Sequence, residues 1–524
     1  MKKKRITALI CAMTLGISLT GCGGAPESSE VYEAAAAEDT AYDGGYYEEM
    51  AESDYIGAEF NTEEYNHIDE NGFLTVSVSP LSTFAVDVDT GSYTNFRRMV
   101  EDHYSIEDIP HGSIRTEEML NYFEYDIPQA DDDNTFTVAY EIGNCPWNEE
   151  NKLLMMSVKA KDVENDTCDN NFVFLIDSSG SMDNSDKGPM AIKSFKMLAK
   201  TLNKNDRVSI VTYSGSSKII LDSCRGDKYN KICKALDSIE FGGGTNGSGG
   251  ITAAYELAEK NFIEGGNNRV IIASDGDMNL GITSNGGLVD LITEKKETGV
   301  FLTVLGYGSG NYSDANMESI ADAGNGNYHY IDCLKEAERV LVEKLKQTTL
   351  TVAKDVKLQV EFNPLEVSEY RLIGYENRTM AAEDFKDDTK DGGETGAGQM
   401  VTVMYELVCS DSDSTGSGLK YQTERELTET AMSGEILTLS IRYKEPAGEE
   451  SAEETFVVKD DEDYEEVSED FLFAAGVVEL SMILNGSDYV GNATLDSAYE
   501  LVMHGCAGDS YREELGDMIK TLSY

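Results

Sequence analysis

Oxygen-bearing side chains follow an apolar run in the middle of the chain. The run 172–176 is continuous, which is typical of a strand buried on both faces of a parallel sheet. It is followed by Asp177, Ser179 and Ser181 in the pattern D-x-S-x-S. A loop that leaves the carboxyl end of such a strand can turn all three side chains towards one point, at the edge where open α/β sheets bind ligands. One carboxylate and two hydroxyls would supply part of the oxygen shell that a hard divalent cation requires.

Two further loops can supply the missing ligands. The glycine-rich segment 242–246 contains Thr245, and a second apolar run, 270–273, is followed by a Ser-Asp-Gly turn that contains Asp275. This ordered set resembles the metal-ion-dependent adhesion site of von Willebrand factor type A (VWA) domains. By that resemblance, the site would consist of Asp177, Ser179, Ser181, Thr245 and Asp275. It would hold a divalent cation, Mg²⁺ in the first place, with Mn²⁺ and Ca²⁺ as alternatives.

The resemblance also implies the kind of partner. The three hydroxyls would contact the ion directly or through one water, while Asp177 and Asp275 would act largely through waters. Neutral inner ligands leave the cation able to accept an acidic group. We therefore expect a Glu or Asp carboxylate of a partner protein to complete the shell, as in ligand-binding VWA domains.

The start of the chain indicates export. Residues 2–5 are basic and residues 6–19 are apolar, a pattern typical of a signal peptide, here 1–21. Leu19-Thr20-Gly21-Cys22 resembles a bacterial lipobox, which implies acylation of Cys22 and a lipoprotein anchored on the extracytoplasmic side of a membrane. Ordinary secretory cleavage, leaving a free Cys22, is the alternative.

The chain is strongly acidic. Its 42 Lys and Arg against 97 Asp and Glu give a net charge of −55, which disfavours nucleic acid and anionic membrane surfaces as partners. Residues 22–71 contain no Lys or Arg, and this segment is expected to be an acidic disordered tether.

The remaining chain is expected to form four parts. A small α+β domain is expected at 72–165 and a VWA domain at 170–348, with a doubly wound, mostly parallel, Rossmann-like α/β sheet. Alternating apolar residues predict a β-rich, sandwich-like domain at 349–465, and helical periodicity predicts a helical segment at 466–524. In the VWA region we expect strands near 172–176, 207–212, 218–221, 269–274, 300–305 and 326–330, and helices near 190–202, 228–239, 248–262, 285–298, 314–323 and 334–346.

This arrangement resembles a family of bacterial VWA-domain lipoproteins with their own N-terminal and C-terminal domains. The stretches that carry the resemblance are 87–93, 117–123, 275–281, 387–391 with Gly398 and 405–406, 473–477 and 511–512. They extend over nearly the whole mature chain. The family implies fold and location, whereas the molecular role of its members is mostly undefined.

Other functions have weaker support. The chain contains no G-x-S-x-G, H-E-x-x-H or P-loop motif, and its five His are scattered, so no enzyme is expected, although an unrecognised hydrolase stays an alternative. Gly242, Gly244 and Gly247 match G-x-G-x-x-G but follow a helical pattern, so no nucleotide site is expected. An envelope scaffold with a purely structural metal is a further alternative.

Seven Cys remain after Cys11 and Cys22, and both a Cys224–Cys233 bridge and free thiols are compatible with the sequence.

Overall fold

The computed structural model describes one of the two units of the chain. The units are Met1–Ala58 and Glu59–Tyr524, and all described residues belong to the second. The described residues are 65, 68–86, 89–127, 134–163, 168–244, 247–276, 285–296, 298–309, 314–324, 326–390, 392–410, 427–446, 448–459, 464, 466–506 and 508–523.

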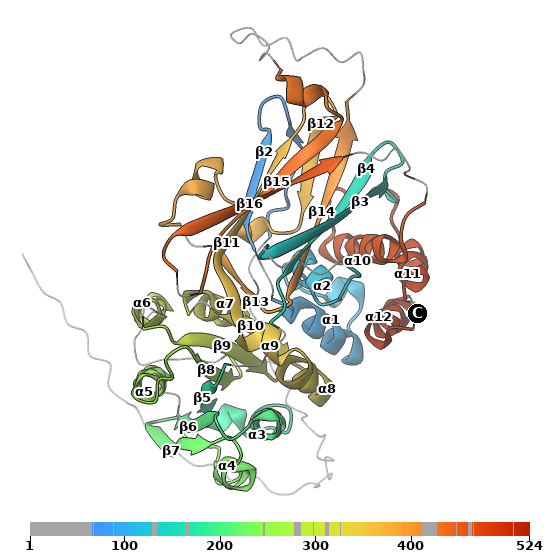
Figure 1. Cartoon of the computed structure of the whole chain (residues 1–524). Coiled ribbons are helices and arrows are strands. Elements are labelled where there is room, and N and C mark those ends of the chain that lie inside the picture. The colour runs from blue at the N-terminus through green and yellow to red at the C-terminus, as the bar shows by residue number, and fades with distance from the viewer. Residues whose placement is uncertain are drawn as a thin grey trace, which may run out of the picture. The chain divides into compact units, whose positions relative to one another are not determined.

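A six-stranded sheet carries the predicted site (Figure 1). Its order is β10-β9-β8-β5-β6-β7, and all neighbouring strands are parallel except the antiparallel pair β6 and β7. The strands are β5 (Asn170–Asp177), β6 (Arg207–Tyr213), β7 (Ser217–Arg225), β8 (Asn267–Ser274), β9 (Phe301–Tyr307) and β10 (Asn327–Ile331). The predicted doubly wound, mostly parallel α/β sheet is confirmed, with an edge strand longer than expected.

Helices cover both faces of this sheet. On one face, Phe172, Phe174 and Ile176 of β5 pack in a core with α3, α4 and α8, and on the other face Val173 and Leu175 pack in a core with α5, α6 and α7. Because alternate side chains of one strand enter two cores, the whole run has to be apolar. The helices are α3 (Gly188–Thr201), α4 (Tyr229–Leu236), α5 (Gly247–Lys260), α6 (Asn285–Lys296), α7 (Asp314–Ala323), α8 (Leu334–Glu338) and α9 (Leu345–Thr349). The helix expected at 334–346 is divided, because a π-helical segment, η3 (Arg339–Glu343), separates α8 from α9.

Two further sheets face each other across a second hydrophobic core, as expected for a sandwich. Their orders are β1-β12-β14-β4-β3 and β13-β11-β15-β16, with β2 also paired to β11. The early strands are β1 (Leu74–Thr75), β2 (Leu81–Ala85), β3 (Phe136–Asn144) and β4 (Lys152–Ala160); the later ones are β11 (Thr351–Phe362), β12 (Val367–Ile373), β13 (Gly393–Gly396), β14 (Met400–Cys409), β15 (Glu435–Lys444) and β16 (Ser451–Lys459).

Strands from both sides of the VWA region therefore build one sandwich. β4 pairs with β14, and β2 pairs with β11, so strands of 72–165 and 349–465 share both sheets. The VWA domain is inserted between β4 and β11 of this sandwich. The sequence did not predict that strands of these two regions pair with each other, because the pairing partner of an amphipathic strand is set by contacts distant in sequence.

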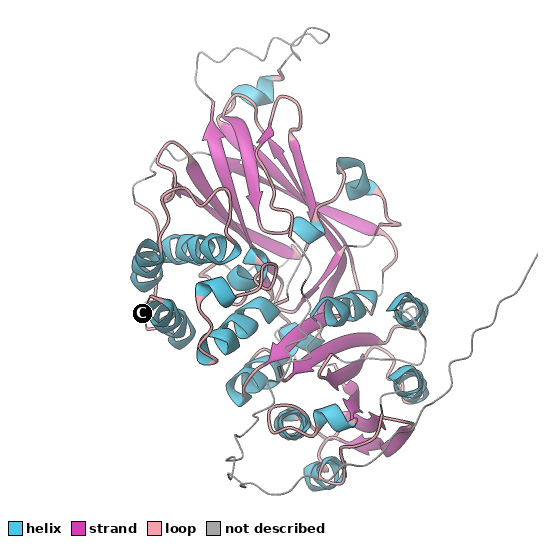
Figure 2. Cartoon of the chain, turned by 180° about the vertical axis from the view of Figure 1, so that it is seen from behind, coloured by secondary structure: helices cyan, strands magenta, loops and turns pink. Residues whose placement is uncertain are grey.

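A helical layer covers the outer face of the sheet that contains β4 and β14 (Figures 1 and 2). It combines early and late helices in a common core: α1 (Gly91–Glu101), α2 (Thr116–Asn121), α10 (Glu469–Asn485), α11 (Leu495–His504) and α12 (Ser510–Leu522). Ser468 caps α10, since its hydroxyl accepts a hydrogen bond from the N–H of Phe471 at 3.0 Å. In the described part of the chain, no helix has both the length and the apolar character needed to cross a membrane.

Candidate metal centre at the edge of the VWA sheet

Adjacent strands bring the two predicted acidic ligands to one edge. β5 and β8 are parallel neighbours, with Ile176 opposite Ala273. Asp177 is the last residue of β5, and Asp275 comes directly after β8. Both residues are buried, at 0% and 1% exposure. The sheet therefore places both carboxyl groups at the same carboxyl-terminal edge.

The D-x-S-x-S loop folds back on its own aspartate. Asp177 Oδ1 accepts a hydrogen bond from the N–H of Ser179 at 2.8 Å, an Asx turn that directs the loop across the strand end. The hydroxyls of Ser179 and Ser181 lie 3.0 Å apart. Ser179 is buried, whereas Ser181 is exposed within the short 3₁₀-helix η2 (Gly180–Met182). Two hydroxyl oxygens thus lie together at the rim of the sheet.

The glycine-rich loop that precedes Thr245 is bonded to this first loop. The N–H of Gly180 donates to the carbonyl of Gly243 at 3.1 Å, and the N–H of Gly242 donates to the carbonyl of Ser178 at 2.9 Å. Gly243 has φ +90°, a conformation that glycine adopts without steric cost. Thr245 itself lies outside the described residues. Its contribution stays a prediction, supported by the position of the loop that leads to it.

One oxygen of Asp177 is available for a ligand. Oδ2 is buried and forms no hydrogen bond of standard geometry among the described residues, although the hydroxyl of Tyr213 faces this carboxyl group and lowers its pKa. Burial raises the pKa of Asp177 to about 6, the N–H of Ser179 opposes this rise, and the negative charge of Asp275 adds to it. A buried carboxylate that lacks a partner is costly, and a bound cation would remove that cost.

Lys187 is a member of this site that sequence reasoning missed. Its ammonium donates to Asp275 Oδ2 at 3.1 Å, and both side chains are buried. Lys187 lies at the start of α3, and its aliphatic part packs so closely on Gly308 that a Cβ there would lie 2.4 Å from it. A lone Lys in a loop gives no sequence signal for this position, because only the fold brings it to Asp275.

The donor chemistry fits a hard divalent cation. No group of three or more His, Cys, Asp or Glu gathers as a metal cluster within the described ranges, so the hydroxyls of Ser179 and Ser181 would be needed as ligands. Mg²⁺ accepts such oxygen donors and keeps several waters. Asp177, Ser179, Ser181 and Asp275 are the described residues that would hold it.

The described residues 384–390 of the acidic loop before β13 do not offer a comparable site. Asp388 Oδ1 accepts hydrogen bonds from Arg442 Nη2 at 2.9 Å and Ser451 Oγ at 2.7 Å, and Asp384 lies 3.8 Å from Lys390 Nζ. Protein cations and hydroxyls already satisfy these carboxylates.

Among the described residues, the Cys that follow the tether form no disulfide bond. They are Cys145, Cys168, Cys224, Cys233, Cys333, Cys409 and Cys506. The bridge considered between Cys224 and Cys233 is therefore absent from the structure.

The fold and the loop geometry define a protein with a VWA domain. A family model described as von Willebrand factor type A domain matches residues 172–277, and one described as von Willebrand factor matches residues 59–155. VWA domains generally bind a divalent cation. The presence of a VWA domain supports a protein-interaction or adhesion-type role.

The family is more specific. A model described as the C-terminal part of the uncharacterized protein YfbK matches residues 347–524. The uncharacterized protein YfbK of Escherichia coli (strain K12) is 40% identical over 441 residues, which cover 83% of this chain and 76% of that protein. The chain belongs to the YfbK family.

Solved structures resemble the fold more distantly. A von Willebrand factor type A protein from Catenulispora acidiphila is 14% identical, covering 75% of this chain and 91% of that one, with a TM-score of 0.39. The ArnB paralog VWA2 from Sulfolobus acidocaldarius is 16% identical, and the match covers 74% of this chain and 98% of that one, with a TM-score of 0.35.

Proposed function

We propose that this protein is a membrane-anchored lipoprotein whose VWA domain binds a divalent cation and, through it, an acidic group of a partner protein. The observation that carries the proposal is the buried Oδ2 of Asp177, which forms no hydrogen bond of standard geometry among the described residues and lies in the loop that presents the hydroxyls of Ser179 and Ser181. Adhesion or envelope assembly are the roles that such binding would serve.

The charge at the site supports an anionic ligand. Asp177 and Asp275 carry two negative charges, Lys187 carries one positive charge, and Mg²⁺ would add two. The loaded site would then hold a net charge of +1 in a poorly solvated position. A Glu or Asp side chain of the partner would neutralise this charge, and it would supply the oxygen that the hydroxyl-rich shell leaves vacant.

The location is proposed from the start of the chain. Cys22 lies outside the described residues, and the sequence around it resembles a lipobox. Acylation there would anchor the protein on the extracytoplasmic side of a bacterial membrane. The mass of the purified protein tests this: we expect an acyl increment that the Cys22→Ser variant lacks, and two masses that differ only by the Cys-to-Ser substitution would contradict it.

Calorimetric titration tests the metal site. The purified chain should bind Mg²⁺, and Asp177→Ala should abolish this binding while leaving the circular dichroism spectrum unchanged. Partner capture from solubilised envelopes should then be lost both in EDTA and with Asp177→Ala. Partner capture that persists under both conditions would eliminate the metal-dependent interaction.

One observation favours a second candidate, a scaffold with a purely structural site. Lys187 already neutralises Asp275, so part of the centre is balanced without an ion. Under this alternative, EDTA would lower the melting temperature without releasing the partner.

A further inference from the structure

The charge of this acidic protein is unevenly distributed. Residues 187–234 contain eleven Lys or Arg and three Asp, whereas the whole chain contains 42 basic and 97 acidic residues. This segment comprises α3, β6, β7 and most of α4. A net charge calculated for the whole chain therefore conceals one strongly basic region.

Six of these lysines form two rows on neighbouring helices, which we call the lysine track. The track consists of Lys193, Lys196 and Lys200 on α3, and Lys228, Lys231 and Lys234 at the start of α4 and along it. Spacings of three and four residues place each set on one side of its helix. Five of the six are exposed, and Lys196 is half-buried.

Contacts at both ends show that the two helices run in opposite directions side by side. Lys196 of α3 forms an ion pair with Asp237, which follows α4. At the other end, the N–H of Gly226 donates to the carbonyl of Asp206 at 2.8 Å, which joins the segment before α4 to the segment after α3. The two helices therefore lie next to each other on one face of the VWA sheet (Figure 1).

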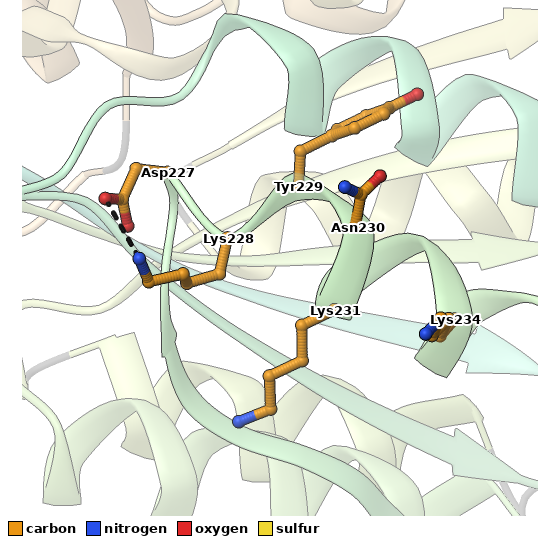
Figure 3. A pocket seen from close by; sticks show the side chains of 6 residues that line it. All are labelled: Asp227, Lys228, Tyr229, Asn230, Lys231 and Lys234. Atoms are coloured by element: carbon orange, nitrogen blue, oxygen red, sulfur yellow. Dashed lines mark ion pairs between the residues drawn. The ribbon is translucent and has the colours of Figure 1, made fainter.

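Most of this positive charge is not neutralised within the protein. Among the described residues, Lys196 pairs with Asp237 and Lys228 lies 3.5 Å from Asp227, whereas the other four lysines of the track form no ion pair. Figure 3 shows Lys228, Lys231 and Lys234 around a shallow hollow of about 420 Å³, together with the half-exposed ring of Tyr229. Unpaired lysines beside an exposed ring offer both charge and contact area to an anionic partner.

The track begins at the candidate metal centre. α3 follows the D-x-S-x-S loop, and the chain after α4 leads into the glycine loop bonded to it. From Lys193 to Lys200 the row extends about 10 Å, the length of roughly three to four extended residues. An extended peptide segment would fit along two neighbouring helices whose lysines lead away from the candidate metal centre. A membrane would instead require a broad basic plane, and the surrounding chain is strongly acidic.

We infer that the lysine track binds an acidic segment of the partner protein, adjacent to the carboxylate received by the metal. This inference rests on the proposed function and specifies the chemistry of the partner: a run of several Asp or Glu residues flanking the metal-binding one. The track would guide this segment to the metal, because long-range attraction accelerates the encounter and fixes its direction.

Fluorescence polarisation with a labelled peptide of twelve glutamates tests the inference. The protein is the full chain with Cys22→Ser, so that acylation does not enter. We expect the peptide to bind in Mg²⁺ at low salt. Binding should be about tenfold weaker for Lys228→Gln/Lys231→Gln/Lys234→Gln, because three partly exposed charge pairs together contribute about that much to the affinity. The matched control is Lys260→Gln/Lys390→Gln/Lys459→Gln, which removes the same charge from lysines paired with Asp222, Asp384 and Glu435. Control binding should stay within twofold of the unsubstituted chain.

The outcomes separate this inference from the metal proposal. If Asp177→Ala leaves peptide binding unchanged while the track variant weakens it, the track is supported and the metal-carboxylate contact is not. Equal weakening by the control and track variants, or no peptide binding at low salt, would overturn the inference. Binding to vesicles that contain one third phosphatidylglycerol is the last measurement. If the track variant binds these vesicles more weakly than the control variant does, while the peptide binds the two variants equally, the track binds a membrane and the inference is wrong.

Discussion

The Lys187–Asp275 contact sets part of the charge of the candidate metal centre. The ammonium lies 3.1 Å from Asp275 Oδ2, with both groups buried, so it neutralises a charge that would otherwise attract the cation. Lys187→Met keeps the aliphatic stem on Gly308 and removes the charge. We expect lower stability without metal, by about 3 kcal/mol, because a buried carboxylate loses its partner.

The same substitution should tighten Mg²⁺ binding, since the site then carries one more uncompensated negative charge. The measurement is the melting temperature with and without Mg²⁺, for which the Mg²⁺-induced increase should be larger in Lys187→Met than in the unsubstituted chain. Lys193→Met, an exposed position on the same helix, is the control. A smaller or equal increase in Lys187→Met would mean that the lysine does not oppose the cation.

His329 on β10 should make the fold sensitive to acid. Its Nδ1 lies 3.3 Å from Thr90 Oγ1, and burial, followed by the positive charge of Arg339, lowers its pKa to about 3. Above its ordinary pKa of about 6.5, His329 is neutral in both states and costs nothing. As the pH falls below 6.5, the unfolded chain takes up a proton that the folded chain cannot, so stability is lost down to about pH 3.

Urea unfolding between pH 7 and pH 5 measures this effect. This histidine should account for a loss of about 2 kcal/mol over that range, and His329→Phe should remove that part of the loss. His504→Phe, in the last turn of α11, serves as the comparison. Parallel stability profiles for His329→Phe and the unsubstituted chain would show that His329 is protonated in the folded state.

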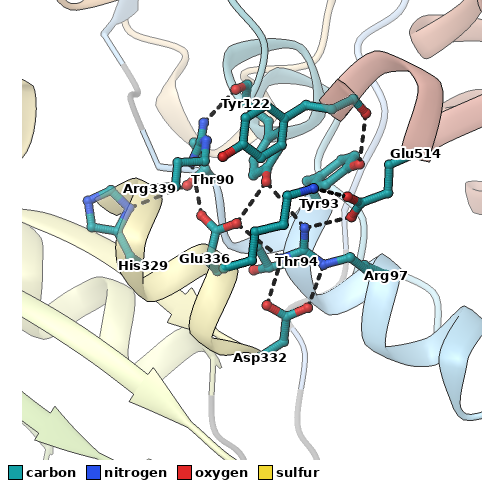
Figure 4. Close-up of polar contacts among 12 residues, drawn as sticks. Thr90, Tyr93, Thr94, Arg97, Tyr122, His329, Asp332, Glu336, Arg339 and Glu514 are labelled. Atoms are coloured by element: carbon teal, nitrogen blue, oxygen red, sulfur yellow. Dashed lines mark hydrogen bonds and ion pairs between the residues drawn. The ribbon is translucent and has the colours of Figure 1, made fainter. Parts of the chain in front are cut away.

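At the scale of elements, an ionic cluster joins the VWA domain to the helical layer (Figure 4). Arg97 on α1 forms two hydrogen bonds to Asp332, at 2.6 and 2.7 Å, and contacts Glu336 on α8 at 3.0 Å and Glu514 on α12 at 2.8 Å. Tyr122, which follows α2, donates to Glu336 at 2.7 Å. One guanidinium thus connects three elements that are far apart in sequence.

Arg97→Met should destabilise the protein by about 3 to 5 kcal/mol, because it leaves Asp332 buried without its cation. The double variant Arg97→Met/Asp332→Leu should recover part of this loss, since it removes the unpaired carboxylate as well. Arg225→Met, which breaks an exposed pair with Asp227, should cost less than 1 kcal/mol. Similar losses for the two single variants, measured by urea unfolding, would show that the cluster does not stabilise this junction.

At the scale of the whole molecule, the features that depend on local sequence patterns could be predicted, whereas those that depend on contacts between distant segments could not. The strands and helices of the VWA domain follow from apolar runs and helical spacing, and the placement of Asp177 and Asp275 follows from the rule for parallel strand ends. Lys187, the Arg97 cluster and the mixed sandwich had no local signal, because each depends on segments between about ninety and several hundred residues apart. The lysine track was present in the sequence, but the overall charge of −55 concealed it.

The insertion of the VWA domain into the sandwich predicts opposite results for two deletions. The ends of the insertion lie close together: the N–H of Gly398 donates to the carbonyl of Lys161 at 3.1 Å, and the N–H of Ala397 donates to that of Leu350 at 2.9 Å. Replacing 164–349 by a short Gly-Ser linker should therefore leave a folded sandwich, with a cooperative thermal transition at a lower temperature because the Arg97 cluster is lost.

Deletion of 466–524 should instead prevent folding, although it removes fewer residues and lies at the end of the chain. Twelve of the seventeen residues of α10 are buried, and they share one core with α1, α2 and the outer face of β4 and β14. Without α10 to α12 this face would expose a large apolar surface, which a soluble sheet does not tolerate. Circular dichroism melting and dye binding to exposed apolar surface measure both deletions. If the chain without 466–524 melted cooperatively and the one without 164–349 did not, the helical layer would be an accessory and the VWA domain would be the element that organises the fold.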